Sequence, residues 1–361
     1  MDQIIDLHCD TVAEIQAGAD IISGHPSGHI DLDRLRKGRV GGQVFAAYIS
    51  SAIPEDKAFS ECRKLLEIID RLCLDHQSYF QKVWSAEDLE RTIAENRVAV
   101  FPAVENGYAI ENDLRKLENL RSFGIRYMTL THARNLKWAA SSGEKQSAIE
   151  GLTPFGKKVI TAMNEMGIIV DLSHVHESTF WAALKESKRP PIASHSDAAA
   201  LCATPRNLTD DQIKAIADKG GMIGINFFPG FLDKQYLTEQ TKRCGDLFER
   251  FSRIESDYWQ DPQSRAAGMH QLGDELLGRM ADVTVGSEAI LRHINHIIDL
   301  VGDDYVGFGS DFDGLPTLPH GISGCDIFPL LIGRMRSEGF SGETIHKISS
   351  VNFMRVLKAN P

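Results

Sequence analysis

Short apolar runs alternate with longer amphipathic segments along most of the chain. Eight runs are rich in β-branched and other apolar residues, and most of them end in polar or ionisable side chains: residues 4–10, 43–50, 98–105, 127–132, 168–174, 191–196, 222–228 and 306–311. Nearly continuous apolar strands of this kind are typical of a parallel sheet that is covered on both faces. The pattern therefore predicts eight parallel strands.

Segments with helical spacing separate most of these runs. They cover residues 58–78, 86–96, 113–123, 154–166, 176–187, 210–219 and 287–301, and one more, residues 341–357, follows the last run. Thr209 with Gln212 forms the pattern of a capping box, and Ser341 is a favourable N-cap residue. Eight strands that alternate with helices predict an α/β fold of the (β/α)8 TIM barrel type rather than an open sheet.

Two connections are longer than the others. Residues 136–153 predict a surface loop, and residues 229–286 are mostly polar with a helical pattern. No Pro-, Gly- or Ser-rich linker divides the chain. We therefore expect one barrel domain over residues 1–361, in which residues 229–286 form a helical insertion between the seventh and eighth strands and serve as a lid or a partner surface.

Composition and charge narrow the class of protein. Of the 361 residues, 42% are hydrophobic and 25% are charged, which excludes disordered and fibrous classes. The formal net charge of -11 argues against binding to nucleic acid or to an anionic membrane surface. The sequence has no apolar window long enough to cross a bilayer and no signal-peptide pattern, so we expect a cytoplasmic protein with six reduced cysteines.

Ionisable residues gather at the ends of the predicted strands. Six of the eight runs end in side chains suited to metal or proton chemistry: His8 with Asp10, Glu105, His132, His174, His195 and Asp311. In a barrel enzyme the carboxyl ends of all strands surround one mouth, and the active site lies there. Residues far apart in the chain are therefore expected to meet at this mouth.

Each of these residues also has a simpler explanation. His8 and Asp10 lie two positions apart on a strand, so both can face one ion, but a polar strand end would look the same. Glu105 closes an apolar run, where an acid is costly unless it is paired or metal-bound, although a turn or N-cap acid also fits. His174 and His195 end consecutive strands, and each alone could be a hydrogen-bonded core histidine.

Together these residues form a donor set of nitrogen and oxygen atoms without thiolates: His8, Asp10, Glu105, His174 and His195. This set suits Zn²⁺ or Mn²⁺ rather than Cu(I) or an iron–sulfur cluster. Five ligands exceed the three that one catalytic zinc ion usually takes from a protein, so we predict two ions that share Glu105. His176 would complete an HxH pair, but it lies past the strand, where a helix begins, and we exclude it.

Three further residues are candidates for chemistry or binding. Asp311 ends the eighth strand and can hold a water molecule and move its proton, whereas Asp313 shares that face and ranks second. An Asp-Gly turn with a capping acid is the simpler explanation of this segment. Arg206, beyond the sixth strand, can bind a carboxylate as a forked pair, unless it is a surface arginine. Cys9 should face away from the ligands that flank it, because side chains alternate along a strand.

Several short motifs match one known family in order along the chain. They are DLHCDT (6–11), VENG (104–107), YMTLTHARN (127–135), GLTPFG (151–156), VDLSH (170–174), ASHS (193–196), RN (206–207) and GSDFDG (309–314). The ordered set resembles the renal (membrane) dipeptidases, which are zinc dipeptidases with amidohydrolase-like barrels. Mammalian members are secreted, disulfide-bonded and lipid-anchored, and the chain shows none of those signals, so it resembles a bacterial-type cytoplasmic member. Residues 229–286 show the least likeness.

The resemblance implies two zinc ions. His8 and Asp10 would bind one ion, His174 and His195 would bind the other, and Glu105 would bridge them.

The resemblance also implies the substrate and the roles of three residues. Asp311 would handle the proton, His132 would contact the substrate near the scissile carbonyl, and Arg206 would bind its C-terminal carboxylate. The expected substrate is a dipeptide, including dipeptides with a C-terminal D-residue. Independently of the resemblance, we expect an acidic group near the metal ions to bind the other terminus.

Two other classes of protein stay open. Other metal-dependent amidohydrolases, such as lactonases or deaminases, commonly carry HxH on the first strand and Lys on the fourth, whereas this chain has HxD and the acid Glu105. A non-catalytic barrel that binds a ligand would be expected to have lost metal ligands, yet every candidate position carries a donor side chain. A homodimer is allowed, but no motif argues for one.

Overall fold

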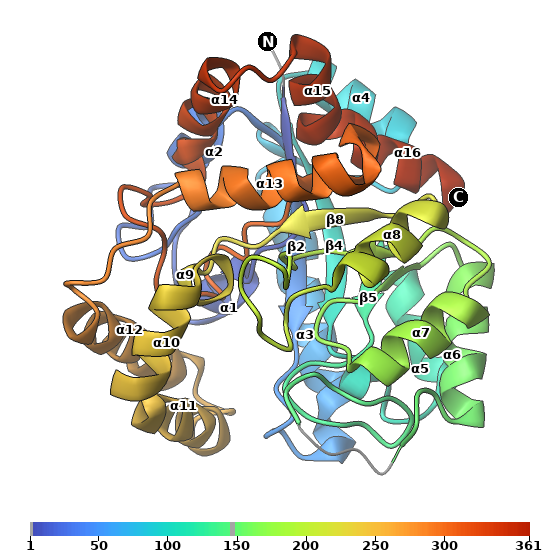
Figure 1. Ribbon diagram of the computed structural model, residues 1–361. Helices are drawn as coiled ribbons and strands as arrows, with labels where there is room; N and C mark the ends of the chain where they lie inside the picture. Colours follow the sequence, from blue (N-terminus) through green and yellow to red (C-terminus); the bar gives the residue numbers. More distant parts are fainter. Residues whose placement is uncertain (1–2, 145–148) are drawn as a thin grey trace.

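Eight parallel strands close into a barrel in the computed structural model, which describes residues 3–144 and 149–361 (Figure 1). The strand order is β2-β1-β9-β8-β7-β6-β5-β4-β3, and a further pairing of β2 with β4 closes the ring. The barrel strands are β1 (Ile4–Asp6), β2 (Val40–Tyr48), β4 (Val98–Glu105), β5 (Tyr127–Thr129), β6 (Ile169–Asp171), β7 (Ile192–Ala193), β8 (Met222–Ile225) and β9 (Val306–Phe308). The predicted α/β barrel is confirmed.

β3 (Phe80–Lys82) is an additional strand that the sequence pattern did not predict. It pairs with the first residues of β4, from Val98 to Val100, whereas β5 pairs with Val104 and Glu105 at the end of β4. Only Phe80 in this strand is buried, so no apolar run marks it in the sequence.

The observed strands are shorter than the predicted runs at their carboxyl ends. β7 has two residues within the run 191–196, and β5 has three within the run 127–132. The chain leaves the ladder near the point where the ionisable residues begin. Two of those residues, His174 and Asp311, have φ angles of 65° and 62°, which no regular strand contains.

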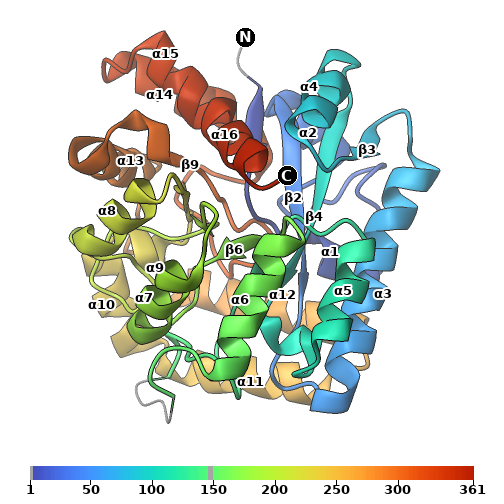
Figure 2. The same cartoon turned by 90° about the vertical axis from the view of Figure 1, so that its right-hand side faces the viewer.

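Helices surround the barrel (Figures 1 and 2). The predicted helices are confirmed within a few residues: α3 (Glu55–Asp75), α4 (Ala86–Ala94), α5 (Leu114–Ser122), α6 (Pro154–Glu165), α7 (Glu177–Glu186), α8 (Asp210–Asp218) and α13 (Glu288–Val301). The last predicted segment consists of α15 (Gly342–His346), a π-helical turn (Lys347–Val351) and α16 (Asn352–Ala359). Three helices were not predicted: α1 (Thr11–Gln16), α2 (Leu32–Lys37) and α14 (Phe328–Ser337). The predicted capping box of Thr209 and Gln212 and the Ser341 cap are both present.

Apolar side chains fill the inside of the barrel at one end. The interior cluster combines strand residues with residues of α16: Ile5, Leu7, Val44, Phe101, Tyr127, Ile169, Ile192, Met222, Phe353, Val356 and Leu357. α16 therefore closes the end of the barrel at which the strands begin, and the polar side chains lie at the opposite end. Cys9 packs in the layer between strands and helices, as predicted, and all six cysteines are buried and unpaired.

The predicted insertion contains four helices at the mouth of the barrel. They are α9 (Pro229–Leu232), α10 (Lys234–Arg243), α11 (Gly245–Asp257) and α12 (Pro262–Arg279). Figures 1 and 2 both place α11 and α12 at the end of the molecule opposite the N-terminus. α12 packs against α1, where Nε2 of His270 lies 3.2 Å from Oε1 of Glu14. The insertion is thus attached to the helix that directly follows Asp10.

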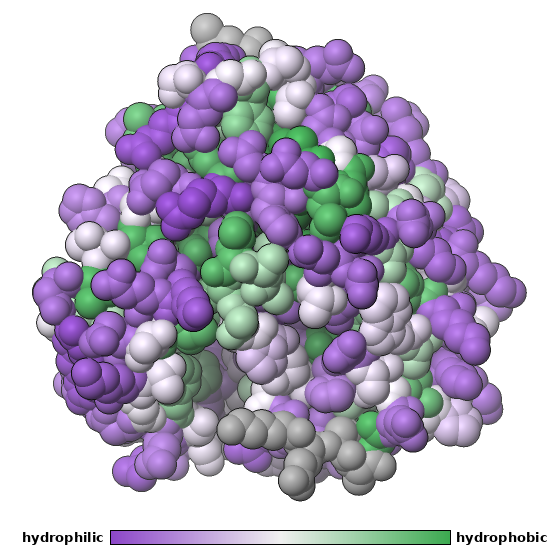
Figure 3. Space-filling view, in the orientation of Figure 1, coloured by the Kyte–Doolittle hydropathy of each residue, from purple (hydrophilic) through white to green (hydrophobic). Residues whose placement is uncertain are grey.

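The outer surface is predominantly hydrophilic in the view of Figure 3, with hydrophobic side chains visible between the helices. Among the helices of the described residues, none combines the length with the apolar composition of a bilayer-spanning segment.

Candidate active site

The strand-end residues predicted from the sequence converge at the mouth of the barrel. Close contacts link seven of them: His8, Asp10, Glu105, His132, His174, His195 and Asp311. The side chains of His8 and His195 are fully buried, whereas those of His132, His174 and Asp311 remain 13–18% exposed. The cluster is therefore shielded on most sides but still accessible to solvent.

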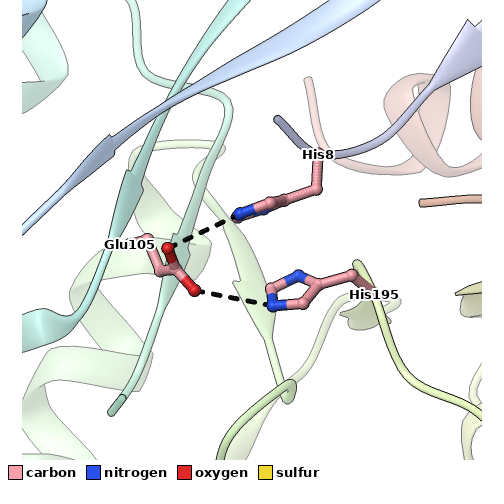
Figure 4. A group of neighbouring side chains, drawn as sticks. All are labelled: His8, Glu105 and His195. Carbon is pink, nitrogen blue, oxygen red and sulfur yellow. Dashed lines mark ion pairs between the residues drawn. The ribbon is translucent and has the colours of Figure 1, made fainter. Parts of the chain in front are cut away.

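Glu105 faces His8 with one carboxylate oxygen and His195 with the other (Figure 4). Its Oε2 is 3.5 Å from Nε2 of His8, whereas its Oε1 is 3.1 Å from Nε2 of His174 and 3.5 Å from Nε2 of His195. Each carboxylate oxygen thus faces different histidine nitrogens. Glu105 is not a helix cap, because Asn106 occupies the N-cap position of the next turn and accepts a hydrogen bond from the amide of Tyr108.

The hydrogen bonds of His8 leave its Nε2 free to bind a cation. The Tyr127 hydroxyl donates to the carbonyl of Leu7 (3.0 Å), so it accepts the proton on Nδ1 of His8 (2.6 Å). The Nε2 atom of His8 is buried without a hydrogen-bond partner, and it faces carboxylate oxygens of Asp10 and Glu105 at 3.5 Å. Although burial opposes it, Tyr127, Glu105 and Asp10 raise the pKa of His8 well above its ordinary value, so this nitrogen carries either a proton or a metal cation between itself and the carboxylates.

His195 is oriented by a similar pair of hydrogen bonds. The Ser194 hydroxyl donates to Oδ2 of Asp171 (2.7 Å) and accepts the Nδ1 proton of His195 (2.7 Å). The Nε2 lone pair of His195 therefore points at Nε2 of His174, which lies 2.8 Å away. A shared proton or a cation must lie between these two nitrogens, and Glu105 supplies the adjacent negative charge.

Asp10 directs its carboxylate into the cluster. Although it occupies the N-cap position of α1, its side chain makes no capping hydrogen bond, and its Oδ1 is buried without a partner. Burial, followed by the negative charge of Glu105, raises the pKa of Asp10 to about 6. The carboxyl group is therefore placed where a cation would favour its charged form.

Asp311 contributes the third acid of the cluster. Its Oδ2 accepts a hydrogen bond from the side-chain amide of Asn226 (2.9 Å), and its Oδ1 lies 3.8 Å from Nε2 of His8. Burial raises the pKa of Asp311 to about 8, an effect that His8 opposes and that Asp10 and Glu105 reinforce. The positive φ of Asp311 is backbone strain, which often accompanies functional sites.

The charges in the cluster depend on one another. Burial alone would raise the pKa of Glu105, but His8 and the other histidines around it hold that pKa well below its usual range. Burial lowers the pKa of His174 and of His195 well below 6.5, which keeps both imidazoles neutral and able to act as ligands.

His132 and Arg206 lie at the edge of the cluster. The His132 Nε2 atom is 3.8 Å from Oε1 of Glu105, and its ring packs against Tyr48 and His174 with centroid distances of 4.6 Å and 4.3 Å. Arg206 donates to the carbonyl of His195 (2.9 Å), and its Nε is buried without a partner. Both side chains therefore retain hydrogen-bonding capacity beside the cluster.

Two residues considered in the sequence lie outside the cluster. Asp313 accepts hydrogen bonds from the Thr11 hydroxyl and from the amide of His29, both 2.6 Å long. Positive φ angles at Asp311 and Asp313 break the strand alternation that would have placed them on one face. His176 caps α7, where its Nδ1 accepts the amide of Ser178, consistent with its exclusion.

The sequence pattern missed the residues that orient the ligands. Tyr127 lies in the apolar run 127–132, and Asp171 lies in the next run, 168–174. Nothing in either run marks these two residues as partners of a histidine. Ser194 directly precedes His195, which was the one available signal. Tyr48 ends β2 directly opposite Glu105 in the β2–β4 ladder, and its aromatic character suggested only a strand. Glu255, a buried acid of α11, was also missed, and it lies in the insertion.

The donor set fits divalent metal ions. Three overlapping groups place their donor atoms within 4.8 Å of one another: His8 with Glu105 and His195, Glu105 with His132 and His174, and His8 with Asp10 and Asp311. The unpartnered Nε2 of His8 and Oδ1 of Asp10 are what a coordinated cation would satisfy. The chemistry of these donors suits zinc or manganese.

A parallel barrel with buried histidine and carboxylate donors at its mouth defines the class of metal-dependent barrel enzymes. Within that class, the profile of the membrane dipeptidase family (peptidase family M19) matches residues 2–360. The chain belongs to this family, and the resemblance seen in the sequence is confirmed.

Proteins of known sequence show the same relationship. The chain is 28% identical to Dipeptidase 3 of Mus musculus over 335 residues, a match that covers 92% of this chain but only 58% of the mouse protein. It is 26% identical to Dipeptidase tcpJ of Claviceps purpurea over 340 residues, covering 92% of this chain and 69% of that protein.

Solved structures extend the likeness to the fold. A metallopeptidase of Rhodobacter sphaeroides, liganded with a phosphinate mimic of the dipeptide L-Ala-D-Ala, is 25% identical, with a TM-score of 0.81 and coverage of 100% of this chain and 99% of the other. The dipeptidase AC, an M19 metallopeptidase, is 26% identical, with a TM-score of 0.81 and coverage of 99% and 98%.

Replacement of Glu105 by Gln tests whether this residue is shared by two ions. The neutral amide removes the charge that faces both donor groups, so we expect the wild-type protein to bind two Zn²⁺ ions per chain and Glu105→Gln to bind at most one. Metal content is measured by mass spectrometry after gel filtration. Glu118→Gln, on the exposed face of α5, is the matched control and should bind as many ions as the wild type. Two ions in Glu105→Gln would contradict the bridge.

Proposed function

We propose that this protein is a metal-dependent dipeptidase that hydrolyses the single peptide bond of a dipeptide. The observation that carries the proposal is the position of Glu105, whose two carboxylate oxygens face different buried histidines in a barrel of the membrane dipeptidase family. Two-metal sites with a shared carboxylate suit the hydrolysis of amides.

The metal ions are proposed to be two zinc ions. His8 and Asp10 would hold one, His174 and His195 would hold the other, and Glu105 would contact both. When bound, such ions polarise a carbonyl group and lower the pKa of water towards neutrality.

Asp311 is proposed to carry the proton during hydrolysis. Asn226 binds one of its oxygens and leaves the other facing the metal donors. Bound cations would favour the ionised form of this carboxyl group, which can accept a proton from the attacking water. The same carboxyl group can then deliver this proton to the leaving amine, whose nitrogen must be protonated as the C–N bond breaks.

His132 is proposed to stabilise the negative charge that develops on the carbonyl oxygen. Its ring is held between Tyr48 and His174, and its Nε2 lies 3.8 Å from Oε1 of Glu105. A donor fixed before the reaction stabilises the transition state without reorganisation.

Arg206 is proposed to bind the C-terminal carboxylate of the substrate. It is anchored by the carbonyl of His195 and the hydroxyl of Ser196, and its unpartnered Nε remains available. We also propose that a C-terminal D-residue is accepted, which the complex of the Rhodobacter sphaeroides metallopeptidase with a mimic of L-Ala-D-Ala supports. A cytoplasmic location and a homodimer stay predictions.

The proposed activity is tested with a panel of L-L and L-D dipeptides, with the released amino acids quantified by chromatography. We expect cleavage of dipeptides, loss of activity after chelation and recovery with added Zn²⁺. Metal content is measured on the same samples. Failure to cleave every dipeptide in the zinc-loaded state would contradict the dipeptidase proposal, and full activity after chelation would contradict its metal dependence.

Replacement of Asp311 by Asn tests proton transfer. The amide cannot accept the proton of water, so we expect kcat to fall by about 10²–10⁴-fold while the bound metal is retained. Steady-state kinetics and metal analysis provide the measurement. Asp313→Asn is the control, because Asp313 is bound to Thr11 and His29 outside the cluster, and it should keep kcat near the wild-type value. An unchanged kcat in Asp311→Asn would remove Asp311 from the mechanism.

Replacement of Arg206 by Ala tests carboxylate binding. Loss of a charge-assisted pair should raise KM for a dipeptide by roughly 10–100-fold. The same variant should change KM for the C-terminal amide of that dipeptide by much less, because the amide never forms the ion pair. Equal effects on both substrates would refute the proposed clamp.

A further inference from the structure

The insertion places a buried carboxylate at the mouth of the barrel. Glu255 lies on α11 and is only 5% exposed, although acidic side chains are seldom buried without a partner. Among the described residues, no Lys or Arg nitrogen lies within ion-pair distance of it. A buried carboxylate without a cationic partner is costly, so a cationic group of a bound substrate would stabilise it.

One tyrosine links Glu255 to the candidate active site. The Tyr48 hydroxyl donates a hydrogen bond to Oε2 of Glu255 (3.1 Å), and the Tyr48 ring packs on His132 with a centroid distance of 4.6 Å. Tyr48 pairs directly with Glu105 where β2 and β4 end. Burial, together with Glu255 and Glu105, raises the pKa of Tyr48, so the phenol stays a neutral donor.

The strand order places this carboxylate across the mouth from Arg206. β2, which carries Tyr48, and β7, which leads to Arg206, are four strands apart in the ring of eight. Glu105 and the histidines lie between the two sides. A dipeptide zwitterion has the same order of charges: an ammonium group, the scissile amide and a carboxylate within a length of about 7 Å.

Contacts between helices hold α11 in place. Arg250 of α11 pairs with Glu275 of α12 (2.6 Å), and α12 is in turn attached to α1 through His270 and Glu14 (3.2 Å). The position of Glu255 is therefore coupled to the helix that begins at the strand-end residues.

We propose that Glu255, positioned by the Tyr48 hydroxyl, binds the free α-ammonium group of the dipeptide. The inference rests on the proposed dipeptidase function and assigns a specificity role to the insertion. An ammonium group at Glu255 and a carboxylate at Arg206 fix the distance between the two termini. N-acylated substrates lack the positive charge, and peptides with an additional residue cannot satisfy both groups.

The test compares two ligands that differ only in the amino group. Alanyl-D-alanine carries the ammonium group, and N-propionyl-D-alanine replaces it with hydrogen. KM and kcat are measured for the dipeptide, and the inhibition constant of N-propionyl-D-alanine is measured against it. We expect Glu255→Gln to raise KM for the dipeptide by about 10–100-fold, with a smaller change in kcat, and to leave the inhibition constant within about twofold. Tyr48→Phe should raise KM less, because it removes only the group that positions Glu255.

Controls separate a binding role from a structural one. Glu249→Gln changes an exposed acid on the same helix and should leave all constants unchanged. The thermal midpoint and metal content of Glu255→Gln should match the wild type, since Gln has the same size. An unchanged KM, or an equal loss for both ligands, would overturn the role of Glu255 while wild-type dipeptidase activity stands. If zinc-loaded wild-type protein cleaves no dipeptide, the proposed function fails and this inference fails with it.

Discussion

The shared carboxylate of Glu105 is the constraint on which the rest of the site depends. It is almost fully buried, and its two oxygens face different histidines. Such a group is stable only if positive charge lies close to both oxygens. The surrounding hydrogen bonds are consistent with this requirement, because Tyr127 and Ser194 hold the Nδ1 protons of His8 and His195 and leave each Nε2 turned towards Glu105. Ligand orientation is therefore set by neighbours that carry no metal chemistry themselves.

The barrel and its insertion have different roles in the proposed enzyme. Strand ends supply the buried donors, which need rigid positions, because small displacements weaken coordination and proton transfer. α16 fills the opposite end with apolar side chains, so polar groups are concentrated at one mouth. The helices of the insertion stand over this mouth and contribute Glu255. In this arrangement the chemistry belongs to the barrel, and the selection of substrate length and charge belongs to the segment with the least likeness to the family motifs.

Much of the fold was predictable because one physical pattern repeats. Apolar runs of strand length and amphipathic helices predicted the eight barrel strands and most of the helices. β3 was missed, because a strand with one buried residue leaves no apolar run. Candidate ligands were predictable because the strand ends of a parallel barrel meet at one mouth. A residue at the end of a strand could therefore be expected to lie close to the residues at the other strand ends. Asp313 was ranked second to Asp311 because strand alternation would place both on one face, and this alternation fails where the two residues adopt positive φ.

The sequence by itself determined the barrel, the family and the residue types available at each strand end. These are properties of local periodicity and of short motifs, which the chain carries without reference to distant residues. Only the tertiary structure decided which oxygen of Glu105 faces which histidine, that Asp313 is bound by Thr11 and His29, and that Glu255 reaches Tyr48 from a helix roughly 200 positions away in the chain. These contacts depend on how loops and an insertion pack against the mouth, and no local pattern encodes that packing.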